Sequence, residues 1–136
     1  MPIARLLADD TFGAERETPA DPTPYLAAFD RIDADPRSLL AVAEIRGRVV
    51  GCLQLSFITG LYNRGADFAL VQAVRVDAEL RGEGVGQALM SWAMDQARAQ
   101  GCSSIELLTH KSRADAQRFY ERLGFQPSHL GMKRAL

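Results

Sequence analysis

The sequence feature that most constrains the fold is a glycine-rich turn that joins a strand-like run to an amphipathic helix. The strand-like run ends at Val76, a short polar turn leads into Arg81-Gly82-Glu83-Gly84-Val85-Gly86, and the helical pattern then begins. Glycines let a backbone approach a ligand closely, and the first amides of a helix have no intrahelical acceptor. Together with the helix dipole, these amides form an anion site suited to a pyrophosphate. A tight turn alone would explain one glycine, but hardly three glycines and an arginine.

The glycine spacing excludes two common phosphate-binding motifs. A nucleotide P-loop ends in Gly-Lys-Ser/Thr, whereas Gly86 is followed by Gln87 and Ala88. A dinucleotide fingerprint needs a third glycine where Gln87 stands, and it follows the first strand of a parallel sheet. The present motif follows a pattern typical of an antiparallel meander instead.

A second motif lies about thirty residues downstream and reads Phe119-Tyr120-Glu121-Arg122-Leu123-Gly124-Phe125. Ala116, Phe119, Tyr120 and Leu123 recur at helical spacing and form one apolar stripe. Gly124 is placed to end this helix as its C′ residue, and we expect Phe125 to begin a new strand.

The two motifs, in this order and spacing, resemble those of the GCN5-related N-acetyltransferase (GNAT) family. That family's glycine motif reads Gln/Arg-x-x-Gly-x-Gly/Ala, and its later motif reads Phe/Leu-Tyr-Glu-x-Leu-Gly-Phe. The resemblance covers roughly residues 2–136. It implies a single N-acetyltransferase domain over residues 1–136, with an α/β (α+β) fold and a mixed, mostly antiparallel sheet flanked by helices. The sheet is expected to splay after Val76 to admit the cofactor.

The resemblance implies acetyl-CoA as co-substrate, held largely by backbone groups, and no metal. It assigns the general acid for the departing thiolate to Tyr120, although Tyr120 is also explained as a core aromatic residue. Family members often carry Asn near the position of Arg113, where the arginine could meet phosphate or lie on a solvated helix end. The expected cofactor-binding residues are Val74, Arg75 and Val76 for the pantetheine arm, Arg81, Gly82, Glu83, Gly84, Val85, Gly86 and Gln87 for the pyrophosphate, and Arg113.

The general base that family members use has no counterpart at the matching positions of this sequence. Some relatives carry Glu at the position of Gln72, and others carry it at the position of Leu108, but neither residue here can accept a proton. Gln72 could orient a water that relays the proton to solvent, and it is the second expected catalytic residue. The leading hypothesis is an N-acetyltransferase acting on a primary amine of a small molecule or protein. The alternative is a non-catalytic acyl-CoA-binding or sensory domain.

Composition and charge limit the kinds of molecule that this chain is expected to bind. The chain has 136 residues, is 47% hydrophobic and carries a net charge of −1. No run is long and apolar enough to span a membrane, no signal peptide is visible, and Cys52 and Cys102 lack metal-ligand spacing, so we expect a cytoplasmic protein. Residues 1–36 hold three arginines and eight acids, and such an acidic segment attracts cations or is simply solvated. Few aromatics and a slightly acidic balance argue against nucleic acid.

The remaining pattern predicts helices over Pro2–Ala8 and Pro24–Asp33 with a loop over Asp10–Thr23 between them. Relatives usually begin with a strand and then a helix, whereas this sequence opens in the predicted helix. Either the start is assigned late, or Leu39–Ile45 is left as an apolar sheet edge that could pair with a second copy in a homodimer. Ala88 and Trp92 are expected on the buried face of the long helix, and Ser112 as the cap of the Tyr120 helix. Further expectations are strands Val49–Ile58, Asp67–Val76 and Ser104–Leu108, a loop over Thr59–Gly65, a helix Gly84–Gln100 and two short strands at the C-terminal end.

Overall fold

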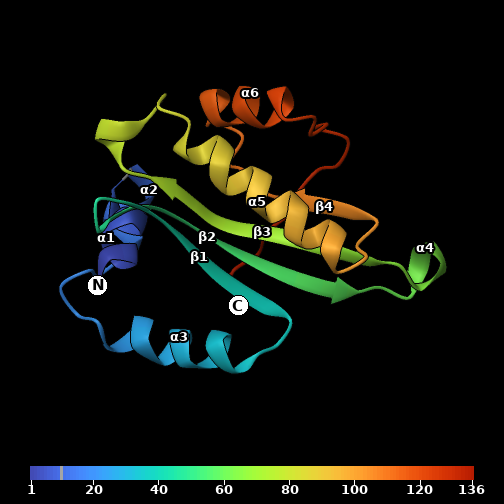
Figure 1. Cartoon of the computed structure of the whole chain (residues 1–136), viewed down its shortest axis with the longest axis horizontal. Helices are drawn as coiled ribbons and strands as arrows, with labels where there is room; N and C mark the ends of the chain where they lie inside the picture. Colours follow the sequence, from blue (N-terminus) through green and yellow to red (C-terminus); the bar gives the residue numbers. More distant parts are fainter. Residues whose placement is uncertain (10) are drawn as a thin grey trace. The chain divides into compact units, whose positions relative to one another are not determined.

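The computed structural model describes residues 1–9 and 11–136, which form two compact units, Met1–Glu106 and Leu107–Leu136. Expected and observed boundaries agree within about two residues for most elements. The elements in chain order (Figure 1) are α1 (Pro2–Ala8), α2 (Thr11–Arg16), α3 (Thr23–Ala34), β1 (Ser38–Ile45), β2 (Arg48–Thr59), α4 (Tyr62–Gly65), β3 (Asp67–Val76), the 3-10 helix η1 (Ala78–Leu80), α5 (Val85–Ala99), β4 (Ser104–Leu107) and α6 (Ala114–Arg122).

The sheet has four strands in the order β1-β2-β3-β4, and β1 to β3 form an antiparallel meander. The amide of Ser103 donates to the Asp67 carbonyl at 2.8 Å, so β3 and β4 begin at the same end of the sheet. They therefore run parallel, joined by α5 (Figure 1). The predicted mixed, mostly antiparallel sheet, with Asp67–Val76 beside Ser104–Leu108, is confirmed.

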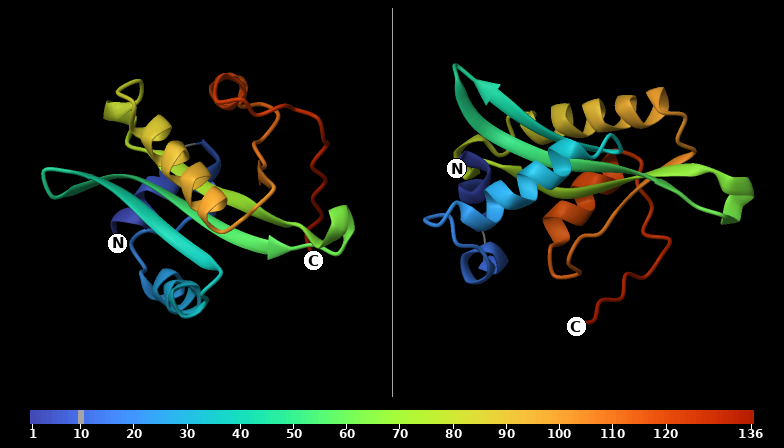
Figure 2. Two further views of the ribbon diagram at one scale, coloured as in Figure 1. Left: turned by 45° about the vertical axis from the view of Figure 1, so that its right-hand side comes forward. Right: turned by 90° about the horizontal axis from the view of Figure 1, so that it is seen from below.

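Helix α5 covers one face of this sheet, while α1 and α3 lie on the other (Figure 2). Leu53, Leu55 and Phe57 alternate along β2 on the α5 side and are buried. Successive residues of a strand point to opposite faces, and on the other face of β2 Val50 and Cys52 are buried while Gln54 and Ser56 are half-buried. The buried residues that α5 contributes are Val85, Leu89, Met90, Ala93 and Ala97.

The expected burial of Ala88 and Trp92 is wrong, since Ala88 is exposed and Trp92 is only half-buried. Both residues line a shallow groove with the apolar side chains of β1. The sheet ends at β1, so no further strand closes this groove. The edge itself is apolar, with Val42 43% exposed and Ile45 44% exposed. No strand precedes β1 in the part of the chain that the structure describes.

The expected loop over Asp10–Thr23 is also wrong, because α2 occupies Thr11–Arg16; Asp10 itself lies outside the described residues. Gly13 explains the error. A Cβ placed at Gly13 would lie 1.9 Å from the carbonyl oxygen of Leu7. This glycine therefore permits close packing of α2 on α1 and does not mark a flexible turn.

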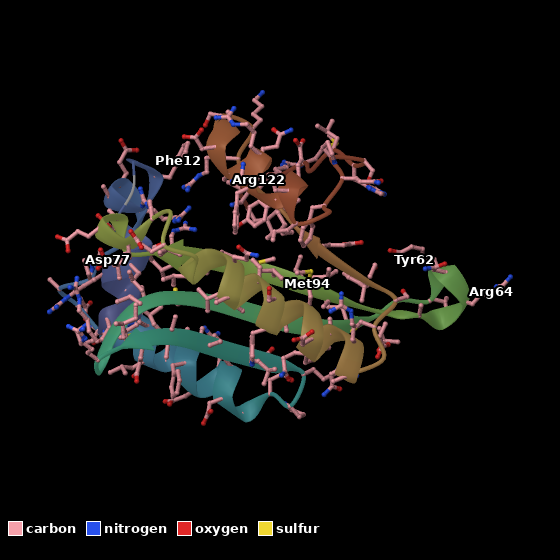
Figure 3. The ribbon with its side chains drawn as sticks, turned by 45° about the horizontal axis from the view of Figure 1, so that its top comes forward. Phe12, Tyr62, Arg64, Asp77, Met94 and Arg122 are labelled. Atoms are coloured by element: carbon pink, nitrogen blue, oxygen red, sulfur yellow. The ribbon has the colours of Figure 1, made fainter. Side chains whose placement is uncertain are left out.

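Two β-hairpins connect the meander. Ile45 pairs with Arg48, and Arg46 and Gly47 between them both have positive φ, 52° and 78°, as a two-residue hairpin turn requires. The β2–β3 connection, expected to be a loop, contains the short α4. The Arg64 side chain points away from the sheet at the tip of the hairpin (Figure 3), whereas the Tyr62 ring lies beside Gly60, where a Cβ would be 3.1 Å from Tyr62 Cε1.

The C-terminal unit contains α6 and differs from expectation at both ends of that helix. Arg113, not Ser112, is the N-cap residue, because the Ser112 hydroxyl lies 2.7 Å from Nδ1 of His110. The two expected terminal strands are absent, since no strand follows α6 in the described residues. The Phe125 amide instead donates to the Tyr120 carbonyl at 3.0 Å, so Phe125 completes the helix cap and does not begin a strand.

Candidate functional site

A β-bulge interrupts β3 where the sequence places the pantetheine arm. Gln72 pairs with Gln54 and Arg75 pairs with Cys52, so two residues of β3, Ala73 and Val74, face one residue of β2. Ala73 has φ of 55°, which is rare for a non-glycine residue inside a strand. A bulge turns the backbone out of the regular ladder, and such strained positions often occur at ligand sites.

The second half of β3 extends beyond its parallel neighbour. Strand β3 has ten residues and β4 has four, and the two strands start together. Strand β4 is therefore too short to pair along the bulged half of β3, which begins at Ala73. An extended ligand can add to such an exposed strand edge through main-chain hydrogen bonds. The sequence did not indicate the bulge, because register depends on two strands at once.

The glycine-rich loop follows this half-strand. Asp77 Oδ1 accepts a hydrogen bond from the Glu79 amide at 3.0 Å and caps η1, which turns the chain toward the loop. Gly82 and Gly84 then have φ of 85° and 86°, and a Cβ built on either would meet nothing within 4 Å. The glycines therefore permit the left-handed turn and leave open space beside it. Gly86 lies inside α5 and does not have positive φ.

Helix α5 begins directly after this turn, with Gly84 as its N-cap residue and no side-chain cap. The amides of Val85, Gly86 and Gln87 occupy its first turn, where no intrahelical carbonyl is available to them. The helix is 15 residues long, so its dipole places partial positive charge at this end. Amides, dipole and open glycines together fit an anionic group such as a pyrophosphate.

Gly51 fixes the start of α5 against the sheet and was missed in the sequence. A Cβ there would lie 3.0 Å from Leu89 Cδ1, 3.1 Å from Val85 Cγ1 and 3.1 Å from the Arg75 carbonyl oxygen. The absence of a side chain therefore lets the first turns of α5 approach the bulged half of β3 closely. A glycine in the middle of a strand was the available sequence signal.

The predicted site residues fall in both units. Gln72 is exposed on β3. The residues of this unit that are expected to bind the cofactor through their backbone groups all lie between the bulge and the first turn of α5. Arg113 and Tyr120 belong to the C-terminal unit. The stretch in the first unit comprises Val74, Arg75, Val76, Arg81, Gly82, Glu83, Gly84, Val85, Gly86 and Gln87.

Within the C-terminal unit, Tyr120 is half-buried between two aromatic rings. Its ring centroid lies 5.2 Å from that of Phe119 and 5.9 Å from that of Phe125, the latter edge-on. Gly124, with φ of 97°, ends α6 as predicted and brings Phe125 back onto the helix. The ring of Tyr120 is thus held in place, as both a catalytic and a structural role require.

Burial disfavours the thiolate form of both cysteines. Burial raises the pKa of the Cys52 thiol to about 11, although the Arg75 charge opposes this shift. The thiol lies 3.5 Å from the Ala73 carbonyl and so helps to hold the bulge. Burial also raises the pKa of Cys102. Across residues 1–9 and 11–136, no group of three or more His, Cys, Asp or Glu side chains could hold a metal ion.

Comparison with known proteins identifies the family. The model of the acetyltransferase (GNAT) family matches residues 3–125, and the chain therefore belongs to that family. It is 34% identical over 102 residues to the aminoalkylphosphonate N-acetyltransferase of Salmonella typhimurium, covering 75% of this chain and 66% of that protein. The chain thus spans less than two thirds of that relative, and smaller shares, 39% and 57%, of two further ones.

Solved structures agree on the fold. The crystal structure of a protein described as a transcriptional regulator from Bacillus halodurans is 40% identical, with a TM-score of 0.95, covering 98% of this chain and 91% of that one. The glucosamine-6-phosphate N-acetyltransferase of Arabidopsis thaliana is 17% identical, with a TM-score of 0.81 and coverage of 97% and 87%. At that identity the likeness shows the fold alone. No helix in the described residues has the length and apolarity needed to cross a membrane.

Proposed function

We propose that the protein is an acetyl-CoA-dependent N-acetyltransferase that transfers an acetyl group to a primary amine of a small molecule. The observation that carries this proposal is the continuity between the bulged half of β3 and the open glycine turn at the start of α5. Acetyl-CoA joins an extended pantetheine arm to a pyrophosphate. The bulged half-strand would bind the pantetheine arm, and the glycine turn that follows it would bind the pyrophosphate. A single domain over residues 1–136 is part of the proposal, supported by a family match that includes residues of both units.

Binding would rest mainly on backbone groups. The amides from Gly82 to Gln87 would donate to the pyrophosphate, and Val74 and Val76 would pair with the pantetheine amides as an added strand. A backbone amide at the bulge would also donate to the thioester oxygen and stabilise the oxyanion that forms there. Arg81 and Arg113 add positive charge, in keeping with the net charge of +4 carried by thirteen basic and nine acidic residues over 37–136.

The chemical step needs a neutral amine and a protonated leaving group. The amine nitrogen attacks the thioester carbon, the carbon–sulfur bond breaks, and the thiolate takes the phenolic proton of Tyr120. The proton lost by the amine passes to a water oriented by the Gln72 amide, because a carboxamide cannot accept it. The rate is therefore expected to rise with pH toward the pKa of the acceptor itself.

The comparisons favour this enzyme over a non-catalytic acyl-CoA-binding or sensory domain. The relative that covers three quarters of this chain is named for acetylation of a small amine, which supports a small-molecule acceptor over a protein. The natural acceptor would be selected by residues outside the cofactor loop.

Thiol release from acetyl-CoA, measured with a panel of primary amines, tests the proposal. We expect amine-dependent release together with an acetylated amine detected by mass spectrometry. Tight acetyl-CoA binding in calorimetry with no turnover on any amine would support the non-catalytic domain instead.

A further inference from the structure

The sheet face opposite α5 carries a stripe of uncharged polar side chains beside the bulge. Gln54 on β2 and Gln72 on β3 are direct partners in the antiparallel register, so their side chains share this face. Ser56 lies two positions further along β2 on the same side. Their chain neighbours Leu53, Leu55 and Val71 are buried on the α5 side.

These polar side chains remain accessible to solvent although they lie on the two central strands of the sheet. Gln72 is exposed although it belongs to a central strand, and Gln54 and Ser56 are half-buried. Among the residues that the structure describes, neither glutamine amide makes a hydrogen bond to another protein group. The pair therefore presents amide donors and acceptors to whatever occupies this face.

The position of the pair ties it to the reaction centre of the proposed function, on which this inference rests. Gln72 immediately precedes the bulge residues Ala73 and Val74, and the pair is the last regular one before the register shifts. A ligand group held by the two amides would thus lie next to the backbone expected to hold the thioester.

Charge on this face selects among acceptors. Within β1, β2 and β3, no carboxylate stands in the rows of Gln54 and Ser56, and the next row pairs Cys52 with Arg75. Arg75 Nη1 donates to the Val74 carbonyl at 2.8 Å, which keeps a positive charge close to the bulge. Close to the bulge this charge would repel a second cationic group on the acceptor, while hydroxyl and amide groups would find matching partners in the two glutamines.

We propose that Gln54 and Gln72 together bind a hydroxyl or amide group adjacent to the acceptor's amino group, and that Gln54 is a specificity-determining residue. The preferred acceptors are accordingly primary amines flanked by neutral hydrogen-bonding groups, such as amino alcohols and amino sugars. Plain alkylamines and diamines are poorer acceptors.

The test compares two amines with the same carbon skeleton, serinol and isopropylamine, by kcat/KM at fixed saturating acetyl-CoA. The wild-type protein should favour serinol about tenfold, as expected for neutral hydrogen bonds. In Gln54→Leu this ratio should fall to near one. The matched control Gln100→Leu, an exposed change at the end of α5, should keep the wild-type ratio.

The ratio separates specificity from folding, because loss of folded protein lowers both rates equally. A second variant, Gln54→Glu, should improve a diamine relative to serinol, since it places a carboxylate where the neutral amide stood. An unchanged ratio in both Gln54 variants would overturn the inference while leaving the acetyltransferase intact. Failure of the wild-type protein to acetylate any amine would overturn the proposed function as well, and calorimetry with acetyl-CoA would show whether the donor site remains.

Discussion

A single negative charge at Gly84 should remove most of the affinity for acetyl-CoA. Gly84 is the N-cap residue of α5 with φ of 86°, and a Cβ there meets no atom within 4 Å. Gly84→Asp therefore costs stability only through the left-handed backbone, about 1 kcal/mol. Its carboxylate would project beside the amides that are expected to bind the pyrophosphate.

The electrostatic cost follows from Coulomb's law. Two unit charges about 5 Å apart repel by about 3 kcal/mol at an effective dielectric constant of about 20. Gly84 is exposed, so solvent screening reduces this to roughly 2 kcal/mol. Acetyl-CoA should therefore bind at least about thirtyfold more weakly to Gly84→Asp than to the wild-type protein.

Two matched variants isolate the charge, with affinity measured by isothermal titration calorimetry. Gly84→Asn has the same shape and the same backbone strain without the charge, and should lose only a few-fold in affinity. Gly101→Asp repeats the charge and the strain at the other end of α5, where φ is 78° and a Cβ also meets open space. That end is about 22 Å away along a helix of this length, so affinity should be unchanged. Equal affinities for Gly84→Asp and Gly101→Asp would refute the assignment of the pyrophosphate to this helix end.

Three further predictions concern stability and chemistry. Gly51→Ala should destabilise the fold by about 1–3 kcal/mol, because the new Cβ would press on Leu89 and on the Arg75 carbonyl. The loss should appear as a lower midpoint of denaturant unfolding at constant slope, and an unchanged midpoint would contradict the close approach of α5 to Gly51. Hydrogen bonds from Thr59 and Arg37 lower the pKa of Asp67, so its stabilisation should be present above the ordinary aspartate pKa of about 4 and lost as pH falls further. Asp67→Asn should accordingly lower the midpoint at neutral pH and converge with the wild-type protein in acid. Tyr120→Phe should lower kcat with little change in acetyl-CoA affinity. Acetyl transfer at the wild-type rate across the pH range would show that Tyr120 is a structural residue only.

Local chemistry explains why most of the fold could be predicted from the sequence. Alternating apolar residues predicted β2, the predicted strands Leu39–Ile45 and Val49–Ile58 are separated by only a few residues, and Gly124 ends α6 as expected. These features depend on residues within a few positions of one another. The glycines of the loop were likewise recognisable because their spacing is local.

Features that depend on distant contacts were not predictable. Gly13 looked like a loop residue because its close neighbour is the Leu7 carbonyl of another helix. The bulge at Ala73 carries no residue signature, since alanine usually avoids positive φ and the irregularity arises where the register between β2 and β3 shifts. The prediction of two short strands at the C-terminal end was wrong for a related reason: a strand depends on pairing with a neighbouring strand, which a local sequence pattern does not reveal.

Hydrogen–deuterium exchange with and without acetyl-CoA is the most direct test of the donor site. The account predicts slower exchange at the amides of Gly82–Gln87 and of the bulged half of β3, with little change in β1 and in the β2–β3 hairpin tip. Binding that protects other segments and leaves the glycine turn and β3 unprotected would contradict the account.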